Sequence, residues 1–161
     1  MIFRRANNDD IVFINKMYGD GSKLLGTLGV DQWQNDEMPS ADLNDDIYVL
    51  DDEGIVATAV LMEHDKQYDV IYEGKWISDD SYFAIHRVAT SEDKRQMGYA
   101  KILFDEIEKF AILSGKKSLK VDTHRDNIPM QNFLKKMGYV YCGVIILDIL
   151  KERLAFEKIL K

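Results

Sequence analysis

Apolar and polar residues alternate along several short stretches of this chain, which is the pattern of strands with one face buried. Alternation, together with β-branched and aromatic residues, predicts strands at 1–6, 82–90, 118–124, 139–147 and 153–160. The stretch 47–62 also alternates, and Asp52-Glu53-Gly54 near its middle supplies turn residues, so it is predicted to form a hairpin.

Apolar residues recur every three or four positions in three other segments, which favours helices. The first runs from Asp9 to Leu28, with a break expected near the sequence GDGS at 19–22. The second covers 102–113 and ends at Gly115, and the third covers 128–138, with a proline in its first turn and a glycine at its end.

The order of these elements predicts the fold class. Strands and helices alternate only in the middle of the chain, and elsewhere strands pair with their neighbours in sequence. This order is typical of an α/β (α+β) protein with a mixed sheet flanked by helices, not of a doubly wound parallel sheet. A chain of 161 residues without a linker is expected to form a single domain over residues 1–161.

Composition narrows the partners. The formal net charge is -7, and the acidic residues concentrate in NNDD, DLNDD and LDDEG. Such a surface repels phosphate backbones, so no nucleic-acid partner is expected. It suits a cationic substrate, although a simply solvated acidic face gives the same composition.

Cysteine content and hydropathy indicate the cellular compartment. Cys142 is the only cysteine, which excludes an intrachain disulfide and thiol-rich metal sites. There is no apolar run of about 18 residues and no secretion signal at the start of the sequence. We therefore expect a cytoplasmic protein without a membrane partner.

The stretch TSEDKRQMGYAK at 90–101 contains the first candidate chemistry. A strand precedes it, a helix follows it, and Lys94, Arg95 and Gly98 lie at the junction. Unpaired amides at the start of a helix, with basic side chains beside them, bind anions. An ordinary solvated loop with a glycine at the helix entry is the alternative.

Two segments together resemble a known family. VATSEDKRQMGYAKILFDEIEKFA at 88–111 is similar to the acyl-CoA-binding motif of the GNAT N-acetyltransferases, Gln/Arg-x-x-Gly-x-Gly/Ala, which Arg95, Gly98 and Ala100 fill. DNIPMQNFLKKMGYVYCG at 126–143 resembles the next motif of that family, in which an Asn opens a helix ending in Gly-Phe or Gly-Tyr. The resemblance covers about residues 82–145.

The resemblance implies a largely antiparallel, splayed sheet, the GNAT-like acyl-CoA N-acyltransferase fold, with acetyl-CoA between the strands 82–90 and 118–124. The backbone of Val88, Ala89 and Thr90 would pair with the pantetheine arm, and Asn127 would bond near it. Met130 and Phe133 would pack along the cofactor, or belong to the core. The pyrophosphate would be held by the backbone amides of Arg95, Gln96, Met97, Gly98, Tyr99 and Ala100.

The family transfers acyl groups by direct attack of an amine on a thioester, which calls for a base, because an alkylammonium is protonated at neutral pH. His86 is the first candidate, with a structural histidine as the alternative; simple alternation would place it on the same face as Ala84 and Val88. An amide near Val88 or Ala89 would bind the oxyanion. His124 and Asp122 form a second polar pair. A metal site built from these residues has no supporting ligand spacing, so no metal is expected.

The sequence departs from the family at the acid. The Tyr that usually protonates the thiolate follows the position of Phe133, where this chain has Leu134. Tyr139 and Tyr141 are nearby substitutes, although both also suit a core, and water is a further proton source.

The acceptor is expected to be the amine of a small molecule or peptide. Trp33, Glu73 and Trp76, with His124, are candidates for binding it, because Trp beside carboxylates can hold a cation. Both tryptophans equally suit the core. One rival function is a non-catalytic acyl-CoA-binding or sensing module. Another is a nucleotide-binding protein, but the sequence matches neither the phosphate-loop pattern nor the dinucleotide-binding pattern. Homodimer formation is left open.

Overall fold

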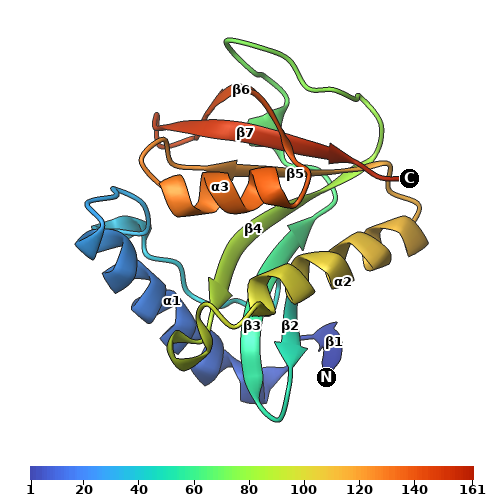
Figure 1. Cartoon of the computed structure of the whole chain (residues 1–161). Coiled ribbons are helices and arrows are strands. Elements are labelled where there is room, and N and C mark those ends of the chain that lie inside the picture. The colour runs from blue at the N-terminus through green and yellow to red at the C-terminus, as the bar shows by residue number, and fades with distance from the viewer. The chain divides into compact units, whose positions relative to one another are not determined.

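The computed structural model describes residues 1–161, and every predicted strand and helix is present in it (Figure 1). The helices are α1 (Ile11–Thr27), α2 (Tyr99–Leu113) and α3 (Ile128–Lys136). The strands are β1 (Ile2–Arg5), β2 (Ile47–Asp51), β3 (Ile55–Met62), β4 (Tyr82–Thr90), β5 (Ser118–Thr123), β6 (Val140–Ile146) and β7 (Glu152–Ile159). Short 3-10 turns, η1 to η4, cover Asn8–Asp10, Asn35–Glu37, Lys66–Tyr68 and Glu92–Lys94.

The seven strands form one sheet in the order β1-β2-β3-β4-β5-β7-β6. β4 and β5 run parallel, with Tyr82 opposite Ser118 and Ile85 opposite Val121. The pairs β1–β2, β2–β3, β5–β7 and β6–β7 are antiparallel. The predicted mixed, largely antiparallel sheet with flanking helices is confirmed.

The chain divides into two compact units, which are described separately. Unit 1 comprises Met1–Leu61 and His86–Ile107, and unit 2 comprises Met62–Ile85 and Glu108–Lys161. β4 and α2 each begin in one unit and end in the other.

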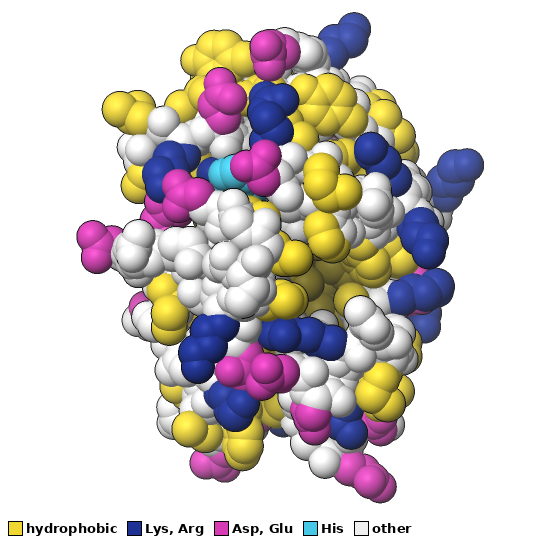
Figure 2. Space-filling view, turned by 60° about the vertical axis from the view of Figure 1, so that its left-hand side comes forward, with side chains coloured by type: hydrophobic (Ala, Val, Ile, Leu, Met, Phe, Trp, Pro, Cys, Tyr) yellow, Lys and Arg dark blue, Asp and Glu magenta, His cyan; other side chains and the backbone are white.

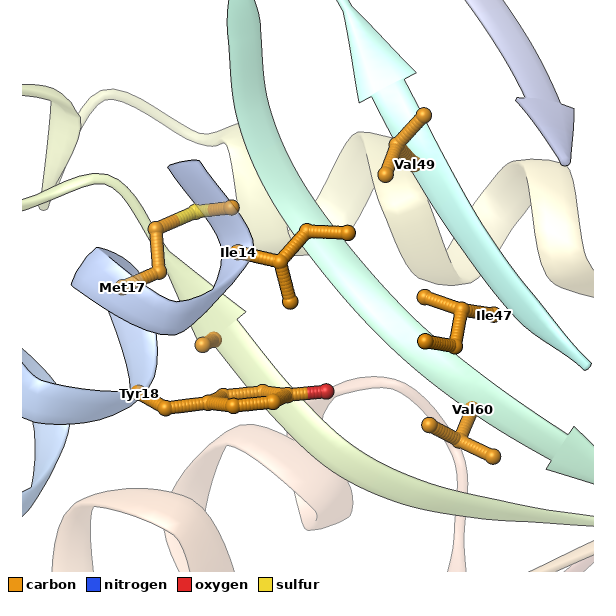
Figure 3. Close-up of a cluster of buried hydrophobic side chains, with 7 residues drawn as sticks. Ile14, Met17, Tyr18, Ile47, Val49 and Val60 are labelled. Atoms are coloured by element: carbon orange, nitrogen blue, oxygen red, sulfur yellow. The ribbon is translucent and has the colours of Figure 1, made fainter. Parts of the chain in front are cut away.

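The core of unit 1 forms where α1 packs on the hairpin of β2 and β3. Figure 3 shows side chains of α1 pointing toward residues of the two strands. The helical side chains follow one another at spacings of three and one, which places them on a single face of α1. The buried members of this cluster are Ile14, Met17, Tyr18, Ile47, Val49, Val60 and Ala89.

The break expected in α1 near GDGS does not occur, because the helix continues unbroken from Ile11 to Thr27. Its glycines make room for a segment that lies against the helix. A Cβ on Gly21 would be 3.0 Å from Cζ3 of Trp33, and one on Gly26 would be 3.0 Å from Oε1 of Gln34. Ser22 Oγ donates to the Trp33 carbonyl at 2.6 Å, and Gln34 Nε2 donates to the Ser22 carbonyl at 2.8 Å.

A buried carboxylate joins β1 to the start of α1. Asp10 accepts from both terminal nitrogens of Arg4, at 2.7 and 3.1 Å, and from the backbone amide of Asn7 at 2.8 Å. Arg4 also donates to Asp51 of β2 at 3.1 Å. The side-chain hydrogen bond from Arg4 is the main reason that the pKa of Asp10 lies below its usual value. The network therefore connects β1, β2 and the residue that precedes α1.

The segment 71–78 of unit 2, here called the strap, lies against β6. Tyr72 and Val144 exchange two backbone hydrogen bonds of 2.7 Å. Gly74 is required beside them, because a Cβ at that position would be 1.9 Å from the Cys142 carbonyl oxygen. The strap therefore covers the edge of β6, which would otherwise expose unpaired backbone groups.

Replacing Asp10 by Asn should destabilise the protein by roughly 1.5–3 kcal/mol at neutral pH, since charge-assisted hydrogen bonds from Arg4 are lost. A carboxylate whose pKa is lowered by folding contributes stability above its unfolded pKa of 3.8, and that stability is lost as the pH falls through the lower folded value. Urea denaturation of both proteins should show a difference at pH 7 that shrinks below about pH 4. A difference independent of pH would contradict this assignment.

The glycines of α1 give a matched pair. Gly19→Ala should stabilise the protein by about 0.5–1 kcal/mol through helix propensity, because the nearest atom to the new Cβ is 4.0 Å away, on Met38. Gly21→Ala should gain less or lose stability, because its Cβ meets Trp33 at 3.0 Å. Thermal unfolding compares the two variants, and equal gains would show that Trp33 is not packed on α1.

Candidate functional site

Between Lys94 and Ile102, in unit 1, no backbone amide makes a hydrogen bond of normal geometry to another backbone group outside the helices. The amides on either side of this stretch do donate. The Lys94 amide donates to the Ser91 carbonyl at 2.9 Å, and the Ile102 amide donates to the Gly98 carbonyl at 3.1 Å. The amides between them include the first turn of α2, which begins at Tyr99. A run of amides without acceptors beside a helix start is a site for an anion.

The shape of this loop is fixed at both ends. Ser91 donates its amide to the Val56 carbonyl on β3 at 2.9 Å, and the Tyr99 hydroxyl donates to Asp52 Oδ2 at 2.7 Å. Gln96 and Gly98 both have left-handed backbone angles, with φ of 62° and 85°. A Cβ on Gly98 would meet nothing within 4 Å, so the glycine serves the backbone angle and not the space.

β4 is irregular where the candidate base lies. Arg87 has a φ of 52° in the middle of the strand, which interrupts the alternation of side chains. The face of His86 therefore cannot be read from that of Val88. His86 and Val88 are half-buried, Ala89 is buried in the core of unit 1, and Arg87 is exposed and pairs with Asp45 at 3.4 Å.

Trp33, a predicted acceptor-binding residue, packs inside unit 1. Its ring meets Tyr18 edge-on, with centroids 5.6 Å apart, and it is half-buried against the core cluster. The Tyr18 hydroxyl is buried without a hydrogen bond, and burial raises the pKa of Tyr18 to about 12. The geometry supports the core interpretation of Trp33 over a cation-binding one.

The acidic segments of unit 1 are partly neutralised. Asp10, Asp45, Asp46 and Asp51 all pair with arginines, namely Arg4, Arg5 and Arg87. On the face shown in Figure 2, acidic side chains lie among Lys and Arg side chains. The acidic composition therefore does not by itself make a cation-binding surface.

In unit 2, Asn127 is the N-cap of α3. Its side-chain oxygen accepts from the Met130 amide at 3.3 Å, and Pro129 lies in the first turn, as predicted. Met130 and Phe133 are half-buried on this helix. Leu134, at the position of the usual family tyrosine, is 0% exposed and belongs to the core.

The two substitute acids have different surroundings. Tyr139 is buried, and burial raises its pKa well above the ordinary value, with the charge of Glu108 acting in the same direction. Tyr141 is exposed on β6 and meets Phe156 edge-on at 5.8 Å. A buried neutral phenol is a poor proton donor, so Tyr141 is the better placed of the two.

The predicted pair of Asp122 and His124 does not act as a pair. Asp122 Oδ2 accepts from the Tyr68 hydroxyl at 2.5 Å. His124 Nδ1 accepts from the Asp126 amide at 3.0 Å, and its side chain is partly buried. Each group therefore has its own partner.

Trp76 already holds a cation, the ammonium of Lys120, whose Nζ lies 4.4 Å from the ring centroid. The sequence did not predict that a polar cluster would form from Lys120, Tyr82 and Glu157. The available signal was the alternation of Ser118, Lys120 and Asp122 along one face of an otherwise apolar strand.

Glu73 is exposed on the strap with a φ of 57°. No group of three His, Cys, Asp or Glu side chains could hold a metal ion. None of the helices has the length and apolar character needed to cross a membrane.

Comparison with known proteins adds to this geometry. The family model described as "Acetyltransferase (GNAT) family" matches residues 23–139. A GNAT-family acetyltransferase structure from Streptococcus agalactiae is 30% identical, with a TM-score of 0.87, over 99% of this chain and 95% of that one. One from Listeria monocytogenes is 17% identical, with a TM-score of 0.73, over 99% and 94% of the two chains.

A third similar structure is yncA from Salmonella typhimurium, solved with its cofactor acetyl-CoA. It is 12% identical, with a TM-score of 0.66, and the match covers 100% of this chain and 94% of that one. At this identity the likeness concerns the fold alone. No curated protein matches the chain.

Proposed function

Because this chain belongs to the GNAT acetyltransferase family, we propose that it is an acetyl-CoA-dependent N-acetyltransferase. It moves an acetyl group to the amine of a small molecule or peptide, by direct attack in a ternary complex. The observation that carries the proposal is the run of unused amides at 95–101. We also propose that residues 1–161 act as one catalytic domain, since the matched region includes residues of both units.

The residues of unit 1 fit a pyrophosphate. The amides of 95–101 supply donors, and Lys94 and Arg95, both half-buried, supply positive charge. Gly98 allows the left-handed backbone angle that the loop has at that position. The backbone of Val88, Ala89 and Thr90 would bind the pantetheine arm.

The residues of unit 2 make a more limited contribution. The side-chain oxygen of Asn127 already accepts from the Met130 amide, so in the proposal its side-chain nitrogen donates to the pantetheine. Met130 and Phe133 are accessible enough to line the cofactor. Tyr141 remains the candidate for protonating the leaving thiolate.

Acetyl-CoA, when bound, supplies an activated thioester. The chain must then remove a proton from an ammonium whose pKa is about 10. In the proposal His86 accepts that proton, directly or through water, and an amide of Val88 or Ala89 donates to the oxygen on which charge develops. For the acceptor, Glu73 is the exposed carboxylate of the strap. His124 stays a further candidate for binding the acceptor, whereas Trp33 packs on the core of unit 1 and the ring of Trp76 holds Lys120.

One observation favours a second function, a non-catalytic acyl-CoA sensor. Leu134 is fully buried and cannot supply the hydroxyl that the family usually places there. Release of free thiol from acetyl-CoA, screened over amines, polyamines, aminoglycosides and peptides, separates the two. Turnover with any acceptor supports the enzyme, whereas tight acetyl-CoA binding without turnover across the panel supports the sensor.

Arg95→Ala should weaken acetyl-CoA binding about tenfold, because a charge-assisted hydrogen bond is lost. Gly98→Ala should weaken it as well, since an L-residue resists the left-handed angle at that position. Titration calorimetry measures both affinities.

The matched control is Lys23→Ala, a charge removed from an exposed position on α1. Thermal stabilisation by acetyl-CoA should also exceed that by ATP or NAD. Equal shifts for the three ligands, or equal losses in the control, would remove the loop as the pyrophosphate site.

His86→Gln should lower the turnover rate by about 10²-fold or more, within the usual contribution of a general base. The pH dependence of kcat near neutrality should flatten, while acetyl-CoA affinity stays unchanged. Steady-state kinetics from pH 6 to pH 9, paired with calorimetry, provide the measurement. An unchanged pH profile would leave His86 a structural residue.

A further inference from the structure

Unit 2 buries a lysine opposite a glutamate. Lys120, in the middle of β5, is 4% exposed, and Glu157 on β7 is 0% exposed. The two residues face each other directly in the antiparallel register of β5 and β7. Lysine and glutamate are almost never buried to this extent without compensation.

Aromatic rings surround the lysine ammonium. Lys120 Nζ lies 4.4 Å from the ring centroid of Trp76 and 4.2 Å from that of Tyr82. Tyr68 supports both rings, at centroid distances of 5.3 and 6.4 Å. The Trp76 indole nitrogen donates to the Tyr68 carbonyl at 2.8 Å, which fixes the ring. Two ring faces within about 6 Å of one cation make a cation–π cage.

The same charges hold the end of the strap. Glu157 Oε1 accepts from the amides of Ile77 and Ser78, at 2.8 and 3.4 Å. Lys120 Nζ lies 3.4 Å from the Ser78 carbonyl oxygen, to which it donates. The strap is therefore attached through the buried pair at this end, and through the paired backbones of Tyr72 and Val144 at the other.

Neither charge is stable here alone. Burial lowers the pKa of the Lys120 amine, and the Glu157 charge opposes that effect. Glu157 Oε2 is buried without a hydrogen bond, so its compensation must come from a neighbouring charge. The Lys120 ammonium, surrounded by ring faces, is that charge.

We propose that Trp76, Tyr82 and Glu157 form an alkylammonium-binding site whose resident ligand is the protein's own Lys120. This ligand fastens the strap, residues 71–78, to the sheet of unit 2. The inference stands on unit 2 alone and does not depend on acetyltransferase activity.

Chemical rescue tests the site. Lys120→Ala removes the side chain beyond Cβ, which corresponds to n-propylammonium. Amide hydrogen exchange of the strap, followed by mass spectrometry, should become about tenfold faster or more in this variant. n-Propylammonium should slow the exchange again, whereas n-propanol, of similar length but without charge, should not.

Two further variants separate charge from packing. Lys120→Met keeps most of the volume and should also speed exchange of the strap, without rescue by n-propylammonium. Glu157→Gln keeps an acceptor for the amides of Ile77 and Ser78 but leaves the ammonium uncompensated, so it should speed exchange too. Lys117→Ala, on an exposed residue just before β5, is the control and should leave the strap unchanged.

Two results would contradict the proposal. If Lys120→Met exchanges like the unaltered protein, or if n-propanol rescues as well as n-propylammonium, packing holds the strap and the proposal fails. Should Lys120→Ala not fold, Lys120→Met in a Trp33→Phe background leaves Trp76 as the only tryptophan. Its emission must then shift toward that of an exposed indole, and an unshifted spectrum would overturn the proposal.

Discussion

A backbone amide that loses water on folding must find an acceptor, and two segments of this protein meet that constraint in opposite ways. In the strap, the amides of Ile77 and Ser78 are bound by a buried carboxyl group, and Tyr72 pairs with β6. In the loop before α2, the amides of residues 95–101 make no hydrogen bond of normal geometry to another backbone group outside the helices. Gln96, Met97 and Gly98 of that loop are exposed, so water can reach its amides. The chain itself therefore satisfies the strap amides, whereas the loop amides stay available to solvent or to a ligand.

The two units also differ in how they bury charged side chains. Asp10 and Arg4 are joined by two hydrogen bonds at the edge of unit 1, where the arginine remains partly accessible. In the pair of Lys120 and Glu157 both members are buried, the cation as well as the carboxylate, so their desolvation is costlier. Two aromatic faces and two backbone amides offset that cost. In the proposal, the buried pair fixes the position of the strap and is not a source of net stability. The strap also needs Gly74, because a side chain there would prevent its backbone from approaching β6.

Local patterns predicted the elements well because periodicity, glycines and prolines act over a few residues. Gly115, Pro129 and Gly138 marked helix ends correctly. The same reasoning failed at Gly21, whose role depends on Trp33, a residue outside the helix. The basic residues and Gly98 predict an anion-binding loop at 95–101, and that role stays a prediction. The cation–π cage around Lys120 could not be predicted from the sequence. Its residues, Trp76, Tyr82, Lys120 and Glu157, lie on separate segments that only the folded sheet brings together. For the same reason, nothing in the sequence near Trp76 showed that its ring is already occupied.

The buried Leu134 looks at first like the loss of a catalytic group, but the chemistry is asymmetric. A thiol has a pKa of about 8.5, so a thiolate leaves readily near neutral pH and takes its proton from water at little cost. An alkylammonium with a pKa of about 10 is almost wholly protonated under the same conditions and cannot attack until a base accepts its proton. In the proposed mechanism, with a half-buried imidazole at His86 as the base and a leucine at 134, the proton transfer without a dedicated side chain is the cheaper of the two. The departure from the family pattern is therefore compatible with turnover, and the demand on catalysis falls on the acceptor amine.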